Sequence, residues 1–418
     1  MPKRILIATI GSLGDLYPCL ALALELRRRG HRVTIASTPY YRSKVEALCI
    51  RFTPMRPDWD PGDPNLIRQC EDLKKGPEVL YRNLMLPELN GTYDDLLSAA
   101  READLLVAGE LVYAAPLVAE KLALRWISII LSPFSLFSSC DPSVMVNIPS
   151  LIHLRRLGAP IYRAGLNLAR LSVRHWSNPV RDLRRREGLR LQCDPIFRDK
   201  FSPHLVLALF SRWLAEPQPD WPSQTQQPGF VHFSDPTAET SISSRLSNFL
   251  AAGDAPIVFT QGSTAVHNPG DFYSVSARAA NRLGKRAVLL GAKTVPEDLA
   301  SDSLALPYAA YSQIFPRALV NVHQGGSGTT GEALRSGRPM LVVPYGWDQP
   351  DNAARVERLG VGLHVRRANY SVETATAALK VLIENPNFAA RAAHIGTQVA
   401  AESGLESACA AIQSMISY

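Results

Sequence analysis

Cysteine is scarce in this chain of 418 residues, with six in all, and the six follow no recognisable pattern. No two of them are spaced Cys-x-x-Cys, and no run of histidines stands beside any of them. Zinc sites and disulfide frameworks depend on such patterns, so we expect neither, and no other bound metal. The cysteine usage is therefore typical of a protein from the reducing cytoplasm.

Long hydrophobic runs are also lacking. The apolar stretch near the N-terminus, Ile5–Ile10, has six residues and is closed by Gly11, which is too short for a secretory signal peptide. No window approaches the roughly 20 consecutive apolar residues that a membrane-spanning helix needs. We therefore expect a cytoplasmic protein that is at most peripheral to a membrane.

Basic residues exceed acidic ones only moderately, 45 against 38, for a net charge of +7. The excess is concentrated in Arg155–Arg190, where ten arginines face two acids. Within it, residues 161–177 form an amphipathic stretch with leucine and tryptophan interleaved, which suits an anionic lipid surface. A solvated helix that covers the first domain is the somewhat stronger alternative. No motif supports nucleic-acid binding.

Alternating strand and helix patterns run through both halves of the chain. The apolar run Ile5–Ile10 predicts a buried strand, Leu16–Arg29 a helix, and Arg32–Ala36 the next strand. The same rhythm restarts at Ile257–Thr260, after a proline- and glutamine-rich segment, 216–230, that is typical of a linker. The length allows two or three domains. Two such halves predict an α/β fold that binds ligands beyond the carboxyl ends of its strands.

The most informative segment begins where a predicted strand runs into His-Gln-Gly-Gly-Ser-Gly-Thr at residues 323–329. Glycines allow backbone N–H groups to approach a ligand closely, and the start of the following helix favours an anion. Tight turning alone is the alternative for such a loop. The residues expected at a phosphate are His323, Gly325, Gly326, Ser327, Gly328 and Thr329.

The next predicted strand, Met340–Val343, delivers Asp348 and Gln349 to the same rim. An aspartate accepts hydrogen bonds and a glutamine both donates and accepts them, so the pair suits neighbouring sugar hydroxyls. A diphosphate held by the glycine loop beside a sugar held by this pair describes a nucleotide-sugar site.

This segment resembles the nucleotide-sugar signature of the inverting glycosyltransferases that include plant and bacterial UDP-glucosyltransferases. The spacing His-x-Gly-Gly-x-Gly-Thr-Thr-Gly, then Gly-x-Pro, then Asp-Gln is most similar to the sterol glucosyltransferase and bacterial rhamnolipid-type branch. The resemblance implies a GT-B fold, with two Rossmann-like doubly wound domains facing a central cleft. It implies an acceptor-binding domain over 1–215, the linker 216–230, a nucleotide-sugar domain over 231–400, and a C-terminal helix over 401–418 that packs back on the first domain.

The N-terminal loop Gly-Ser-Leu-Gly-Asp, residues 11–15, is similar to Gly-Ser-Arg-Gly-Asp of the sterol branch. The resemblance implies that Asp15 removes the proton of the acceptor hydroxyl and that Gly14 lies at the donor. Leu13 replaces the arginine of the sterol pattern, which weakens a sterol assignment. Glu110 is a candidate partner of Asp15 or an alternative base. A helix N-cap for Asp15 and a surface or helix-start position for Glu110 are the simpler alternatives.

The resemblance also assigns weaker positions. It puts Ser263 at the diphosphate, Ala309 at the uracil ring and Glu332 at the ribose of the nucleotide. The alternative for Ser263 is that it caps the helix that follows. Phe134 and Phe137 lie in a serine- and proline-rich loop over 132–151, where they line an acceptor pocket or fill an ordinary core.

Together these features imply an enzyme that moves a hexose, first of all glucose from UDP-glucose, to a hydroxyl of a small hydrophobic acceptor. The sugar nucleotide is a co-substrate, and neither a cofactor nor a metal is expected. Three alternatives stay open: a nucleotide-sugar epimerase on the same fold, a dTDP-sugar (rhamnosyl-type) transferase acting on a lipid, and a non-catalytic protein that keeps the nucleotide site.

Overall fold

The computed structural model describes residues 2–146, 148–191, 194–233, 235, 244–292 and 294–416. The chain divides into two compact units. The first consists of Met1–Phe233 with Ser403–Tyr418, and the second of Ser234–Glu402. None of the described helices is both long and apolar enough to cross a membrane.

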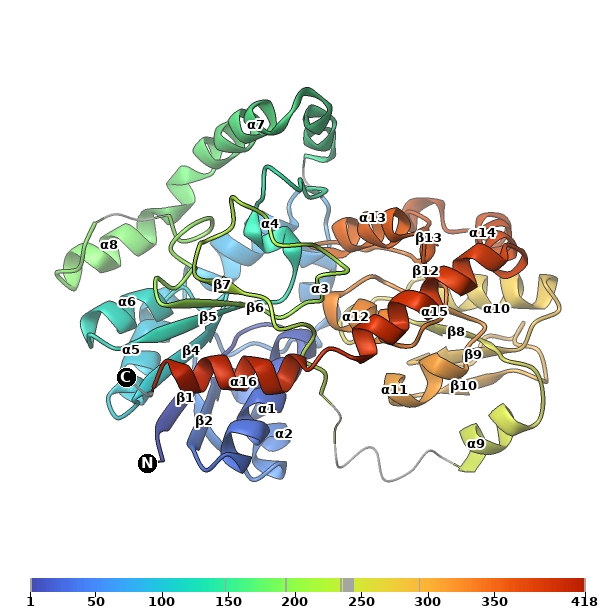
Figure 1. The fold of residues 1–418 in the computed structure, drawn as a ribbon, viewed down its shortest axis with the longest axis horizontal. Coiled ribbons are helices and arrows are strands. Elements are labelled where there is room, and N and C mark those ends of the chain that lie inside the picture. Colours follow the sequence, from blue (N-terminus) through green and yellow to red (C-terminus); the bar gives the residue numbers. More distant parts are fainter. Residues whose placement is uncertain are drawn as a thin grey trace. The chain divides into compact units, whose positions relative to one another are not determined.

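A parallel sheet forms the centre of the first unit, with seven strands among the described residues in the order β3-β2-β1-β4-β5-β6-β7 (Figure 1). Central strands such as β1 and β5 are almost continuously apolar because helices cover both faces of a parallel sheet. The strands are β1 (Arg4–Ala8), β2 (Arg32–Ser37), β3 (Arg51–Pro54), β4 (Leu105–Gly109), β5 (Trp126–Ile130), β6 (Leu205–Ala208) and β7 (Thr225–Gln226).

Short helices connect these strands, with 3-10 turns and one π-helical turn (Val79–Met85) between them. The α-helices of the first unit are α1 (Leu13–Arg28), α2 (Arg42–Ala47), α3 (Pro64–Cys70), α4 (Gly76–Glu78), α5 (Leu89–Ala100), α6 (Ala115–Lys121), α7 (Ala159–Ser172), α8 (Asn178–Arg186) and α16 (Gly404–Ser414).

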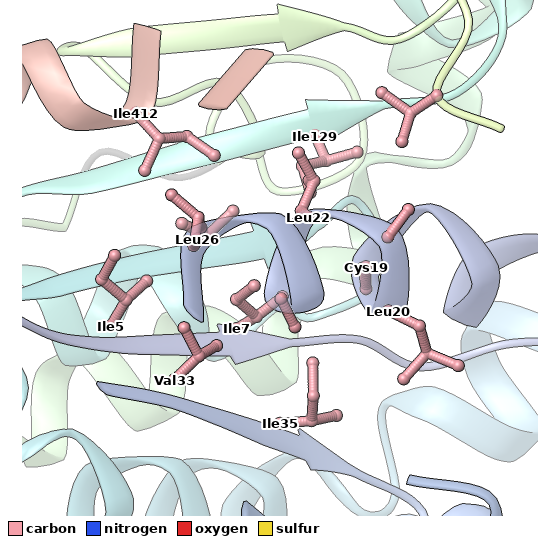
Figure 2. Close-up of a cluster of buried hydrophobic side chains, with 14 of the residues drawn as sticks. Ile5, Ile7, Cys19, Leu20, Leu22, Leu26, Val33, Ile35, Ile129 and Ile412 are labelled. Carbon is pink, nitrogen blue, oxygen red and sulfur yellow. The ribbon is translucent and has the colours of Figure 1, made fainter. Parts of the chain in front are cut away.

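A buried cluster joins α1 and α16 to the first sheet. Ile7 of β1, Leu22 and Leu26 of α1, and Ile412 of α16 are all fully buried in it (Figure 2). Gly404 lets α16 begin against the chain, since a Cβ there would lie 2.1 Å from the carbonyl oxygen of Phe230. The last helix of the sequence is therefore part of the first unit.

Helix α1 begins at Leu13, three residues before the predicted start at Leu16. Ser12 is its N-cap: the Ser12 hydroxyl accepts from the backbone N–H of Gly14, and the Asp15 carboxylate accepts from the backbone N–H of Ser12. This reciprocal pattern is a capping box. The alternative that Asp15 is itself the N-cap is therefore wrong, because Asp15 occupies the third helical position.

Residues 216–230, which the sequence predicted as a linker, lie within the first unit. They contain β7, which pairs with β6 at the edge of the sheet, and the buried Trp221, whose ring forms a T-shaped pair with that of Phe210. The Gln227 amide donates to the carbonyl oxygens of Phe210 and Ala215. Side-chain hydrogen bonds and one buried tryptophan thus hold this polar stretch in the first unit. The second unit begins after Phe233.

The second unit has a parallel sheet of six strands within its described ranges, in the order β10-β9-β8-β11-β12-β13. Renumbered along the unit this order is 3-2-1-4-5-6, as for the first six strands of the other sheet, which is the doubly wound arrangement. The prediction of two α/β halves is confirmed. The strands are β8 (Ile257–Thr260), β9 (Ala287–Leu290), β10 (Leu304–Leu306), β11 (Val320–His323), β12 (Met340–Val342) and β13 (Gly362–His364).

The helices of the second unit pack on this sheet around a core that includes Phe259, Phe272 and Leu379. Their bounds are α9 (Ser244–Ala251), α10 (Phe272–Arg282), α11 (Tyr311–Ile314), α12 (Ser327–Arg335), α13 (Gln349–Leu359), α14 (Val372–Glu384) and α15 (Pro386–Ala400).

Candidate functional site

The predicted donor residues, apart from Gly14 of the first unit, gather at the carboxyl edge of the second sheet. The strand order reverses between the neighbours β8 and β11, and open α/β sheets bind their ligands at such a switch point. Ser263 follows β8, His323 ends β11, and Asp348 with Gln349 follows β12. The topology therefore brings together residues that are up to 86 positions apart in the sequence.

His323 is completely buried, and its imidazole has one filled and one empty hydrogen-bonding position. The Nδ1 atom accepts from the backbone N–H of Gly325 at 3.1 Å, so the proton of the neutral ring is on Nε2. Burial lowers the pKa of His323 to about 3, which keeps the ring neutral. Nε2 is buried and has no partner among the described residues. A buried donor without an acceptor costs about 1–3 kcal/mol, which a bound acceptor would recover.

The glycine loop has its shape because side chains would not fit there. Gly325 has φ +92°, and a Cβ on it would lie 2.7 Å from Cγ1 of Val342. Gly326 is the N-cap of α12 and has no side chain with which to cap the helix. The N–H groups of the first turn and the positive end of the helix dipole are therefore suited to an anion beside His323.

Asn352 ties the glycine loop to the proposed sugar-binding aspartate. Its buried side-chain amide donates to the carbonyl oxygen of Gly325 and to Oδ2 of Asp348, both at 2.9 Å. The Ser327 hydroxyl donates to the same Asp348 oxygen at 2.7 Å. The sequence interpretation missed Asn352, although its position four residues after Asp348 on one helix face was the available signal.

The oxygen and the nitrogen of the Gln349 side-chain amide have different roles. Its carbonyl oxygen accepts from the backbone N–H groups of Tyr345 at 2.7 Å and Gly346 at 3.2 Å, so this half braces the loop between β12 and α13. Only the amide N–H groups could then reach a sugar hydroxyl. Trp347 in the same loop has φ +58°, which is a strained value for a bulky residue and is typical of functional loops.

Ser263 lies half-buried in the turn after β8, next to Gly262. A Cβ on Gly262 would lie 2.1 Å from Nε2 of the buried Gln324, so the Gln324 amide packs against this turn. The side chain of Gln324, which follows β11, therefore packs against the turn after β8, another contact that the sequence interpretation missed.

The remaining donor candidates of the second unit lie near this edge, and their described contacts do not point to a ligand. Ala309 is buried just before α11, Thr329 is buried in the first turn of α12, and Gly328 is exposed. Glu332 is on α12 with Oε1 at 3.8 Å from the guanidinium of Arg335.

Asp15 occupies the equivalent edge of the first sheet, in the first turn of α1, which follows β1. Its Oδ2 accepts from the Ser12 backbone at 2.8 Å and from the Ser12 hydroxyl at 3.2 Å. The carboxylate folds over Gly11, which has φ +136° and where a Cβ would lie 2.2 Å from Oδ2. The capping box thus fixes the Asp15 side chain, and Gly14 donates its N–H to the Ser12 hydroxyl. A carboxylate has four lone-pair positions, so capping and proton removal are compatible.

Glu110 follows β4, the neighbour of β1, but both of its oxygens have internal partners. Oε1 accepts from the Ser135 hydroxyl and Oε2 from the Lys200 ammonium, each at 2.9 Å. Lys200 is buried, and its Nζ lies 4.9 Å from the centre of the Phe137 ring. If Glu110 moved away, the buried Lys200 ammonium would be left without its carboxylate partner, which is costly. This arrangement favours an anchoring role for Glu110 over that of a base.

The two acceptor candidates pack within the first unit. The rings of Phe134 and Phe137 are 5.9 Å apart, and Phe137 lies 4.8 Å from Phe197. Both adjoin the small core cluster of Met145, Leu151, Tyr162 and Leu166. The core role that the sequence left open is therefore present in the structure.

Two family models match separate parts of the chain. The glycosyltransferase family 28 N-terminal domain matches residues 5–81. The C-terminal domain of erythromycin biosynthesis protein CIII-like proteins matches residues 294–410. With the two doubly wound sheets, these matches define the class as a glycosyltransferase with the GT-B fold.

Individual proteins match over nearly the whole chain. O-mycaminosyltylonolide 6-deoxyallosyltransferase of Streptomyces fradiae is 33% identical over 430 residues, covering 98% of this chain and 97% of its own. A sterol 3-beta-glucosyltransferase of Aspergillus fumigatus is 28% identical over 99% of this chain, which spans 30% of that enzyme. The chain belongs to the GT-B glycosyltransferase family of the glycosyltransferase 28 and EryCIII-like type.

A solved structure agrees on the fold. The spinosyn rhamnosyltransferase SpnG, in complex with thymidine diphosphate, superposes with a TM-score of 0.67 at 16% identity over 99% of both chains. The GT-B fold expected from the sequence is thereby confirmed.

We expect the buried neutral His323 to make the protein less stable in acid. The pKa of His323 is 6.5 in an unfolded chain and about 3 in the folded one, so the unfolded state takes up the proton first as the pH falls through this window. His323→Asn keeps an acceptor for Gly325 and does not titrate. Urea unfolding from pH 7 to pH 4 should show the wild type losing several kcal/mol more than this variant. Parallel losses in the two proteins would contradict the buried neutral state.

Asn352→Asp should destabilise the glycine loop and the position of Asp348. The substitution removes the amide donor and sets a carboxylate against the Asp348 carboxylate and the Gly325 carbonyl. We expect a loss of about 1–3 kcal/mol in the free energy of unfolding and a raised KM for the sugar donor. Asn387→Asp, on an exposed part of α15, is the matched control. If the two variants had the same free energy of unfolding and the same KM for the sugar donor, the proposed link between Gly325 and Asp348 through Asn352 would be ruled out.

Proposed function

We propose that this glycosyltransferase moves a sugar from a nucleoside diphosphate to a hydroxyl of a small hydrophobic acceptor, with inversion at the anomeric carbon. The observation that carries the proposal is the buried Nε2 donor of His323, which has no partner among the described residues, beside the uncapped start of α12. Fixed N–H donors at this place would stabilise the charge that develops on the leaving diphosphate. No metal or other cofactor is invoked.

The reaction is a single displacement. Asp15 removes the proton of the acceptor hydroxyl, the acceptor oxygen forms a bond to the anomeric carbon, and the bond from that carbon to the diphosphate oxygen breaks. The fixed position of the Asp15 carboxylate in the capping box supports this role. Glu110 is the weaker base candidate because Lys200 and Ser135 hold its carboxylate.

The first unit would bind the acceptor and the second the sugar nucleotide. Asp348 and the amide of Gln349 would hold the sugar, and His323 with Gly325, Gly326, Ser327 and Thr329 the diphosphate. Some candidates are weaker because their described contacts explain them without a ligand or leave their role open. For the donor these are Gly14, Ser263, Ala309, Gly328 and Glu332, and for the acceptor Phe134 and Phe137.

The donor is proposed in two versions. A dTDP-linked deoxyhexose is supported by the deoxyallosyltransferase relative and by the thymidine diphosphate bound to SpnG. UDP-glucose, the donor expected from the sequence, is supported by the sterol glucosyltransferase relative. Both relatives are transferases, which favours transfer over the epimerase and binding-protein alternatives. A cytoplasmic site of action is part of this proposal, nucleic acid is not a proposed partner, and membrane contact through Arg155–Arg190 is independent of the reaction.

A donor-by-acceptor turnover screen read by mass spectrometry tests the proposal. Sugar nucleotides carrying UDP or dTDP are combined with phenols, sterols, polyketides and lipid alcohols, and one pair should give a product heavier by one sugar residue. Asp15→Asn should then lower turnover by about 10²–10⁴-fold, because a general base contributes that much. Asp94→Asn, on the exposed side of α5, should leave turnover unchanged.

Each result bears on a different part of the proposal. Wild-type turnover by Asp15→Asn would contradict the base assignment alone. A failure of every sugar nucleotide to give product or to raise the melting temperature would contradict the function, since a ligand that binds the folded state must stabilise it.

A further inference from the structure

Helix α7 carries apolar side chains on two different faces. On its inner face, Tyr162 and Leu166 are buried in the cluster with Met145 and Leu151. The helix lies at the edge of the first unit, away from the sheet (Figure 1). Its inner contacts therefore hold it in place while leaving its other face uncovered.

The outer face of α7 is apolar as well. Ile161, Leu168 and Leu171 are 46%, 69% and 62% exposed. With Ala164 they are spaced i, i+3, i+7 and i+10, so they form one stripe along the helix. Leu157, in the 3-10 turn before the helix, is 62% exposed. We call Leu157, Ile161, Ala164, Leu168 and Leu171 the α7 stripe.

Such a concentration is unusual for this chain. Ten large apolar side chains are exposed among the described residues, and four of them belong to the stripe. Single exposed leucines are ordinary on protein surfaces, whereas a continuous apolar strip marks a place of contact.

Positive charge prevails around the stripe. Residues 142–181 contain no aspartate or glutamate, and Arg155, Arg156, Arg163 and Arg174 are exposed. Other arginines of the segment have acidic partners: Arg170 of α7 pairs with Asp194, Arg184 with Glu120, and Arg185 with Asp182. The four exposed arginines around the stripe thus have no acidic partner among the described residues.

We propose that the α7 stripe docks on an anionic lipid surface. The helix would lie in the plane of the interface, with the leucines and Ile161 at the boundary of the acyl chains and the arginines at the phosphates. Charge complementarity favours this partner. Packing the stripe against that of a second copy would bring two clusters of arginines together, which is repulsive.

Vesicle flotation tests the proposal with the full chain. The wild type should float with vesicles of phosphatidylglycerol and phosphatidylcholine, float much less with phosphatidylcholine alone, and be released by salt. The double variant Leu168→Glu/Leu171→Glu should lower the partition coefficient about tenfold or more, since both side chains would leave the acyl boundary. Leu73→Glu, at a side chain that is 53% exposed elsewhere in the first unit, is the matched control and should bind as the wild type does.

Circular dichroism and the melting temperature check that the variants fold, and turnover of a water-soluble acceptor should not change. Three results would overturn the proposal: no binding of the wild type to phosphatidylglycerol vesicles, equal binding by the double variant, or a dimer in sedimentation that the double variant dissociates. The last result would assign the stripe to a second copy of the chain.

Discussion

A single backbone hydrogen bond fixes the centre of the candidate site, the one from Gly325 to Nδ1 of His323. It decides which nitrogen carries the proton, and burial decides that the ring stays neutral. The result is a donor, Nε2, held in the protein interior without an acceptor among the described residues. Because this donor has already been removed from water, an anionic oxygen that reaches it gains a strong hydrogen bond without further desolvation of the protein.

The neighbouring contacts keep that geometry in place. Asn352 holds the glycine loop through the carbonyl of Gly325 and holds Asp348 at the same time. Gln324, which follows β11, packs against the turn after β8. The first unit uses the same principle with different chemistry, since a capping box fixes Asp15 beyond the end of β1. In both units the doubly wound topology provides the carboxyl edge of a parallel sheet. A few hydrogen bonds between side chains and the backbone then fix the positions of the reactive groups at that edge.

Much of the fold follows from local sequence patterns, because buried parallel strands are apolar runs. β8 has the predicted bounds, Ile257–Thr260. The start of α1 was predicted three residues late because its N-cap, Ser12, was taken for a loop residue. The polar composition of 216–230 predicted a linker, and it concealed a short edge strand with a buried tryptophan.

The candidate site was only partly accessible to the same reasoning. The motif around His323 predicted the residues of the rim, because glycine, histidine and an acid-amide pair at this spacing have a chemical use. The partners of Glu110 could not be predicted, since Lys200 lies 90 positions away and no local pattern connects them. Asn352 could have been found from its helical spacing to Asp348, and the orphaned nitrogen of His323 could not, because burial is a property of the whole unit.

The most direct test of the account is calorimetric titration of the protein with thymidine diphosphate and uridine diphosphate, beside His323→Phe. Phenylalanine fills the buried space and removes the donor, so the account predicts that the preferred diphosphate binds at least about tenfold more weakly to the variant, while binding of the parent nucleoside changes little. Equal affinity of the folded variant and the wild type for the diphosphate would contradict the central role of the His323 nitrogen.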